Sequence, residues 1–302
     1  MRFIMLKKLE PKKVRRWVDY ARWFGFVFLI GLVVLRESDL TVSKLYYIGW
    51  PIYPDYVYPD GIQKVDFESL DGTPLNGWYI RCKSPQAAQR PVLLYIHGNA
   101  GNLAAQYFQY SFLADWGYDV FIFDYRGFGF SGGRPTREGL WKDTQAAFRE
   151  LTILAPGRNY GVVGFSMGAA YAVLLASQEP RISAAAYLGG FTTFRDIGSY
   201  TLGTWGFPRW TTPWLAWLLV PNGLDPLESA GVSEHPPALF VHGKADGNIP
   251  YEMGRQLDEV YRGPKELLIM PGYGHGDYFK GPLAGEFHQA FDRLFNRKKK
   301  SS

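Results

Sequence analysis

The stretch "GVVGFSMGAAYAVLLA" at residues 161–176 places a serine between an apolar run and an apolar helical pattern, with a glycine two positions to either side. A strand that turns sharply into a helix forces its central residue into a crowded backbone conformation. Gly164 and Gly168 relieve that crowding because they have no Cβ. The hydroxyl of Ser166 is therefore raised above the end of the strand, at the N-terminus of a helix predicted over 167–178, where amide groups favour negative charge.

The same pattern has a structural alternative. A serine in a Gly-rich turn is also a common N-cap of a helix, and its hydroxyl then only satisfies a backbone amide. Residues elsewhere in the sequence are needed to distinguish a catalytic Ser166 from one that only caps the helix.

Short β-type runs and helical patterns alternate along most of the chain. Three of the runs, "PVLLYIHG", "DVFIFDYRG" and "ALFVHG", are nearly continuously apolar, which is typical of parallel strands covered by helices on both faces. The pattern predicts an α/β fold with a mostly parallel sheet of eight strands and an antiparallel pair at its start. The predicted strands are 62–68, 75–81, 92–96, 119–124, 160–164, 184–188, 238–242 and 266–270, and the predicted helices are 102–116, 138–154, 167–178, 252–261 and 284–296.

Ligands of such sheets bind beyond the carboxyl ends of the strands, so partners for Ser166 are sought there. A serine hydroxyl needs a base, and the base needs an acid that fixes its tautomer. Of the five histidines, His275 lies in a Gly-rich loop after the last run, and Asp246 follows the strand "ALFVHG". We predict a Ser166, His275 and Asp246 triad, with Asp225 and Asp277 as reserve acids. The other histidines are expected to be structural: His97, His235, His242 and His288.

An oxyanion hole needs backbone amides aimed at the carbonyl oxygen of a substrate. The loop "HGNAGN" follows the strand at 92–96 and is rich in small residues. The predicted donors are the amides of Asn99 and Met167. Asp124 and Arg126, which end another strand, are expected to be structural because buried charges near a site are usually paired.

The segment 194–222 is rich in aromatic residues and lies where a cap over the site would be inserted. Its four tryptophans are expected either to bind an apolar acyl group or to dip into lipid. Plain helix packing is the alternative. The tryptophans predicted to bind substrate are Trp205, Trp210, Trp214 and Trp217.

The N-terminal region carries the apolar run "WFGFVFLIGLVVL" at 23–35, between two arginines. Thirteen residues cover only about 20 Å, but counting back to Trp17 makes a spanning helix feasible. The excess of Lys/Arg before the run predicts a cytoplasmic N-terminus and a catalytic domain on the far side of the membrane. The alternatives are a helix lying on the cytoplasmic leaflet and a buried helix packed on the domain.

Charge and cysteine content narrow the function classes. Of the net charge of +5, residues 1–22 contribute +6 and the tail from Arg297 to Lys300 contributes +4, which leaves −5 for the body. Nucleic-acid binding by the body is therefore not expected. Cys82, the single cysteine, excludes an intramolecular disulfide and a cysteine metal cluster. The expected organisation is a basic arm and anchor helix over 1–45, a Pro/Tyr-rich connector over 46–60, the catalytic domain over 61–296 and a basic tail over 297–302.

Five motifs together resemble the serine hydrolases of the α/β-hydrolase fold. They are HGNAGN at 97, DYRGFGFSGG at 124, GFSMG at 164, HGKADGNIP at 242 and PGYGHGD at 271. They are most similar to the membrane-anchored branch of bud-emergence-type proteins and to serine aminopeptidase-like and depalmitoylase-like members. The resemblance implies the same triad, an N-terminal anchor, and no metal or cofactor.

The expected activity is hydrolysis of an ester or thioester with an apolar acyl group, from a small molecule or a lipid. Cleavage of an amide or short peptide and a non-catalytic membrane-anchored scaffold are the alternatives. The aromatic segment at 194–222 departs from the family pattern, so the resemblance implies nothing about the acyl group.

Overall fold

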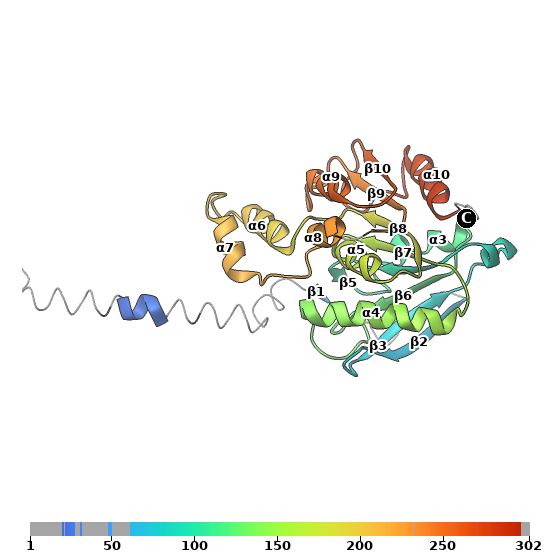
Figure 1. The fold of residues 1–302 in the computed structure, drawn as a ribbon, viewed down its shortest axis with the longest axis horizontal. Helices are drawn as coiled ribbons and strands as arrows, with labels where there is room; N and C mark the ends of the chain where they lie inside the picture. The colour runs from blue at the N-terminus through green and yellow to red at the C-terminus, as the bar shows by residue number, and fades with distance from the viewer. Residues whose placement is uncertain are drawn as a thin grey trace, which may run out of the picture.

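The computed structural model describes residues 61–232 and 234–296, together with residues 20, 22–27, 31 and 48–49. Its centre is one sheet of eight strands in the order β10-β9-β8-β7-β4-β6-β3-β2 (Figure 1). Within this sheet, β3 is antiparallel to both of its neighbours, β2 and β6, and the other neighbouring pairs are parallel. The strands are β2 (Ile62–Glu68), β3 (Pro74–Ile80), β4 (Val92–Ile96), β6 (Val120–Asp124), β7 (Tyr160–Phe165), β8 (Ile182–Leu188), β9 (Ala238–Gly243) and β10 (Lys265–Met270).

Helices cover both faces of this sheet. The side chains of β4 alternate between two cores, with Leu94 and Ile96 on the face of α4 and α5, and Leu93 and Tyr95 on the face of α3 and α10. A strand buried on both faces has no polar side, which explains its continuous apolar sequence. The helices are α3 (Phe112–Asp115), α4 (Arg137–Leu154), α5 (Met167–Gln178), α8 (Pro226–Val232), α9 (Tyr251–Val260) and α10 (Ala284–Phe295). The predicted fold class is confirmed.

The helix predicted over 102–116 is wrong. The structure has turns there, with a 3-10 helix at Tyr107–Gln109 and the four-residue α3. The carbonyl of Leu103, which an α-helix would pair with the amide of Tyr107, instead accepts the Tyr110 hydroxyl at 2.8 Å. The amide of Leu103 donates to the carboxylate of Asp124 at 3.0 Å. These tertiary hydrogen bonds outweigh the helical pattern.

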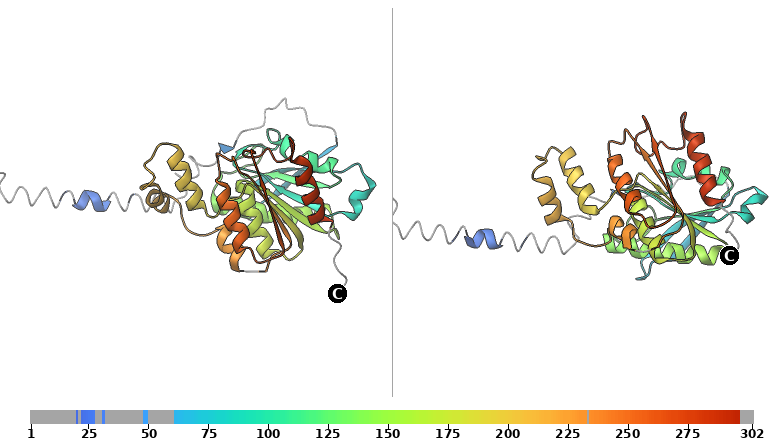
Figure 2. Two further views of the ribbon diagram at one scale, coloured as in Figure 1. Left: turned by 90° about the horizontal axis from the view of Figure 1, so that it is seen from above. Right: turned by 45° about the horizontal axis from the view of Figure 1, so that its top comes forward.

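The cap over 194–222 is a pair of helices, α6 (Phe194–Thr204) and α7 (Thr212–Leu219), that projects from the body (Figure 2). The side chain of Thr193 caps α6 by accepting the amide of Asp196. The two helices are joined by a hydrogen bond of 2.9 Å from Ser199 Oγ to Thr212 Oγ1. The segment that leaves the cap is held to the body, because Arg137 of α4 donates to the carbonyls of Pro221 and Asn222 at 2.8 and 2.6 Å.

The N-terminal predictions fall mostly outside the described residues. Residues 22–27 are helical. No helix in the described part of the chain combines the length and the apolar character needed to cross a bilayer. Of the connector over 46–60, the structure describes β1 (Ile48–Gly49), which pairs in parallel with β5 (Ala100–Gly101). The rest of the apolar run at 23–35 and the basic tail at 297–302 lie outside the described residues.

Candidate active site

Ser166 stands at the turn between β7 and α5. Its backbone has φ 55° and ψ −119°, a conformation that is costly for a residue with a side chain. A Cβ on Gly168 would lie 1.9 Å from the carbonyl oxygen of Ile96, and a Cβ on Gly164 would lie 2.4 Å from the carbonyl oxygen of Gly168. The turn packs directly on β4, which explains why both positions are glycine, and Ser166 remains partly exposed.

Asp246 and His275 come together from two loops. Nδ1 of His275 lies 2.6 Å from Oδ2 of Asp246. A backbone hydrogen bond joins the two loops, from the amide of Ala245 to the carbonyl of Tyr273 at 2.9 Å. The ring of His275 also packs on Phe165, the residue before Ser166, with ring centroids 4.8 Å apart.

The ionisation of Asp246 fixes the tautomer of His275. Burial alone would raise the pKa of Asp246, but hydrogen bonds from His242 and His275 outweigh it and hold the pKa below its ordinary value. The amides of Asn248 and Ile249 donate to its other oxygen, Oδ1, at 2.8 and 2.9 Å. An ionised carboxylate only accepts, so Nδ1 of His275 carries the proton and Nε2 is left as a base.

A cavity of about 550 Å³ lies over the turn, and Ser166 and His275 both line it. The predicted oxyanion donors Asn99 and Met167 line it as well, so the structure brings four of the five predicted catalytic residues to one cavity, with Asp246 directly behind His275. Sequence reasoning missed much of the wall, including Gln106, Gln109, Phe108, Phe165, Phe191 and Asn248.

Only one of the four tryptophans predicted to bind substrate reaches this cavity. One stripe of α6 faces it, made of Ile197, Thr201 and Trp205. Trp210 and Trp214 line neither this cavity nor its neighbour, and Trp217 lines a separate hollow between the cap and α9. The physical reason is that α7 packs on α6, with Ala216 near Gly198, and does not extend over Ser166.

Neither the other histidines nor Asp225 and Asp277 are among the described residues that line the cavity. His97 is buried, the ring of His235 contacts the carbonyl of Ser229, and His288 stacks on Trp116. His242 has a role that sequence reasoning missed, since its Nε2 lies 3.3 Å from Oδ2 of Asp246. The sequence "HGKAD" could have indicated this contact, because it places His242 and Asp246 four residues apart in one loop.

Comparisons with known proteins show the family and the fold of the chain. Residues 91–205 match the family described as the alpha/beta hydrolase fold. The protein YfhR of Escherichia coli O157:H7 is 32% identical over 84% of this chain and 86% of its own length. The chain belongs to the α/β-hydrolase family. The protein bem46 of Schizosaccharomyces pombe is 33% identical over 58% of this chain and 64% of its own length, so the resemblance to bud-emergence-type members is confirmed.

Solved structures share the fold. An esterase of Pyrococcus furiosus superimposes with a TM-score of 0.67 at 20% identity, covering 83% of this chain and 98% of the esterase. At that identity the likeness concerns the fold. The family and the fold together support a hydrolase.

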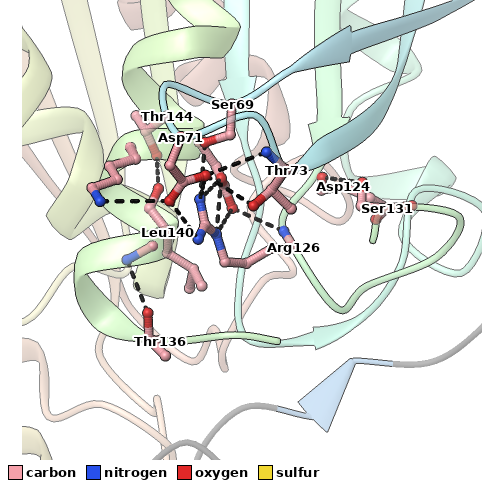
Figure 3. A network of polar contacts seen from close by, with 12 residues as sticks. Ser69, Asp71, Thr73, Asp124, Arg126, Ser131, Thr136, Leu140 and Thr144 are labelled. Carbon is pink, nitrogen blue, oxygen red and sulfur yellow. Dashed lines mark hydrogen bonds and ion pairs between the residues drawn. The ribbon is translucent and has the colours of Figure 1, made fainter. Parts of the chain in front are cut away.

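Arg126 belongs to an ion-pair network with Asp71 and Asp143 (Figure 3) and is not among the residues that line the cavity. Its guanidinium donates to both oxygens of Asp143 and of Asp71, and to Ser69. The hydrogen bond from Arg126 lowers the pKa of Asp71 below its ordinary value, against the opposing effect of burial. The expectation that Arg126 is structural is confirmed, and the network ties the end of β6 to α4.

His97 and Asp124 form a second buried pair, beneath the predicted oxyanion loop. Nε2 of His97 lies 3.6 Å from Oδ1 of Asp124, and neither side chain is exposed. Burial lowers the pKa of His97 to about 4, although its hydrogen bond to the carbonyl of Gly98 opposes the shift. Burial also raises the pKa of Asp124 well above its ordinary value, with the amide of Leu103 opposing. Both shifts favour the uncharged forms of this buried pair.

The pair predicts opposite pH dependences for two variants. In Asp124→Asn, His97 stays neutral in the folded chain while the unfolded chain binds a proton below about pH 6.5, so stability rises by about 3 kcal/mol from pH 4 to 6.5. In His97→Gln, the folded chain keeps the proton of Asp124 that the unfolded chain loses above about pH 3.9, so stability falls as pH rises.

Urea unfolding across this pH range measures both slopes. In the parent chain, the lowered pKa of His97 makes stability rise with pH and the raised pKa of Asp124 makes it fall, so the two contributions oppose each other. A parent slope as steep as that of Asp124→Asn would contradict the assignment.

Proposed function

We propose that this chain is a serine hydrolase that cleaves an ester or thioester with an uncharged, apolar acyl group through an acyl-enzyme. The observation that carries the proposal is the hydrogen bond of 2.6 Å between His275 and Asp246 beside the cavity that Ser166 lines. This arrangement gives one cavity a base of defined tautomer and a strained, partly exposed serine, the two groups that nucleophilic catalysis by a hydroxyl requires.

The proposed reaction has two halves. Nε2 of His275 accepts the proton of Ser166 as the serine oxygen bonds to the acyl carbon, and the amides of Asn99 and Met167 donate to the oxyanion. His275 then gives the proton to the departing alcohol or thiol, which leaves an acyl group on Ser166. Water attacks this acyl group, gives one proton to His275, and releases the carboxylic acid as Ser166 regains its proton.

The walls of the cavity support an uncharged acyl group. None of the described residues that line it is Asp, Glu, Lys or Arg. A carboxylate or phosphate on the acyl chain would have no cation to pair with there and would lose its hydration. Phe108, Phe191, Ile197, Trp205 and Ile249 supply the apolar surface. The cavity walls restrict the acyl group and do not distinguish an ester from a thioester or an amide. Measuring kcat/KM for one acyl group in all three classes of substrate shows which leaving group is preferred.

The proposed location is a membrane, reached through the apolar run at 23–35. Trp23 and Phe24 within this run are exposed, at 69% and 78%, so they are available to lipid and do not support the buried-helix alternative. The excess of positive charge before the run favours a cytoplasmic N-terminus, with the catalytic domain on the far side. The rival placement is a helix lying on the cytoplasmic leaflet.

A fluorophosphonate probe tests the catalytic proposal on the detergent-solubilised full chain. Labelling is expected in the parent and is expected to vanish in Ser166→Ala, because the probe reacts only with an activated serine. Ser111→Ala is the matched control and should label like the parent, since this serine does not line the cavity. A folded parent chain that does not label would favour the non-catalytic scaffold.

A further inference from the structure

The tip of the cap presents an unusual surface. We define the cap tip as Trp205, Phe207, Arg209, Trp210 and Trp214, from the end of α6 to the first turns of α7. All five are exposed, and Trp210 most of all, at 84%. The cap projects from the body in the views of Figures 1 and 2. Three of the four tryptophans of the cap thus lie exposed around the connection between its two helices.

The packing of α7 is the reverse of what helix packing alone produces. The helix buries Thr212, Ala216 and Leu218, while Trp214 and Trp217 remain 61% and 51% exposed. A surface helix in water normally buries its largest apolar side chains and exposes polar ones. Plain helix packing, the alternative stated for this segment, therefore does not account for the exposed tryptophans.

The charge pattern points to the partner. Between Asp196 and Asp225, the chain has a single charged residue, Arg209, and no carboxylate. A surface of tryptophan and phenylalanine with one cation and no anion matches the headgroup level of a bilayer, where an indole ring buries its apolar body and keeps its N–H in a polar layer. Protein-binding surfaces usually add a rim of charged residues, whereas Arg209 is the single charged residue of this tip.

The N-terminal segment meets the domain close to the cavity, which agrees with a membrane near the cap tip. β1 at Ile48–Gly49 pairs with Ala100–Gly101, and both residues of β5 line the catalytic cavity. The segment thus meets the domain at the rim of the cavity that α6 also lines. Only 12 residues separate Leu35 from Ile48, a reach of at most about 45 Å. A membrane that holds the apolar run lies within that distance of the cavity rim.

We infer that the cap tip docks on a phospholipid surface and brings the mouth of the cavity to the headgroup layer. Trp205 belongs to both the cap tip and the cavity wall, so docking places the entrance at the interface. An apolar acyl chain then enters from the bilayer without crossing water. This consequence for the substrate rests on the proposed hydrolase function, whereas docking itself does not.

Site-specific fluorescence tests the docking in the full chain. Cys82, the single cysteine, is first changed to serine, which keeps an acceptor for the amide of Ser84. An environment-sensitive NBD label is then attached in Trp210→Cys and, as control, in Ile153→Cys. Ile153 is exposed near the C-terminal end of α4, which runs back from the cavity edge of the sheet. The vesicles contain phosphatidylcholine, a minority of phosphatidylglycerol and nitroxide-labelled lipid as quencher.

The label at 210 is expected to shift to the blue on nitroxide-free vesicles, with emission rising roughly twofold or more as the site leaves water, and to be quenched by nitroxide lipid. The label at 153 should show neither change. Roughly 1 M salt, which shortens the Debye length to about 3 Å, should leave the shift largely intact because apolar area drives it. Arg209→Glu should reduce the shift, because a carboxylate at the tip is repelled by the anionic lipid.

Three results would overturn the inference. They are a label at 210 that does not respond to vesicles, labels at 210 and 153 that respond equally, and a shift at 210 that appears without lipid and grows with protein concentration. The last result would assign the cap tip to a second copy of the chain. None of these readouts requires turnover, so failure of docking is distinguishable from failure of the proposed hydrolase.

Discussion

Replacing Asp246 with asparagine is expected to lower kcat for ester hydrolysis about 10⁴-fold. Oδ1 of Asp246 accepts the amides of Asn248 and Ile249, so the carbonyl oxygen of the new asparagine would stay there. Its NH₂ group would then face Nδ1 of His275 in place of Oδ2. Because NH₂ donates, Nδ1 must accept, the ring proton moves to Nε2, and the base for Ser166 is lost.

The kinetic parameters separate this effect from a general loss of structure. Asp246 does not line the cavity, so KM should stay close to that of the parent while kcat falls. Asp225→Asn and Asp277→Asn are matched controls, expected to stay within about twofold, because neither carboxylate is hydrogen-bonded to His275 among the described contacts. An Asp246→Asn chain that keeps a tenth of the parent kcat would rule out this carboxylate as the partner of the base.

The strands could be predicted closely because burial on two faces leaves a strong sequence signal. The predicted run at 92–96 coincides with β4, and the run at 160–164 falls one residue short of β7. The failure at 102–116 has the opposite cause. That stretch is helical in pattern, but its backbone is held by Asp124 and Tyr110, whose contacts depend on the completed sheet. Tertiary hydrogen bonds of this kind leave no periodic trace in a sequence.

The candidate site likewise has residues that the sequence pattern indicates and residues that only the folded structure brings together. Ser166, Asp246 and His275 could be found because each ends an apolar run, and the ends of parallel strands meet at one edge. The wall formed by Gln106 and Gln109 lies within the segment whose conformation was wrongly predicted. The tryptophans were visible in the sequence, but which of them faces the cavity depends on how α7 packs on α6, and composition does not fix that packing.

Gly168→Ala is expected to destabilise the folded chain by about 3 kcal/mol or more, because the new methyl group has no room. Its Cβ would lie 1.9 Å from the carbonyl oxygen of Ile96 and 2.6 Å from that of His97, and both contacts are backbone atoms that cannot rotate away. The higher helix propensity of alanine returns only about 1 kcal/mol. The cost of the clash therefore exceeds the gain in helix propensity. To relieve it, β4 and α5 must move apart beside Ser166.

Urea unfolding of the detergent-solubilised chain measures this loss, and Gly285→Ala is the matched control. Gly285 lies in the first turn of α10, and a Cβ there would meet nothing within 4 Å. The same chemical change should therefore leave stability unchanged or raise it by up to about 1 kcal/mol. Since Gly168 packs on the backbone of Ile96 and His97, where the loop that carries Asn99 begins, fluorophosphonate labelling of any folded Gly168→Ala chain should also slow. Equal stability of the two variants would mean that the turn does not pack on β4 as described.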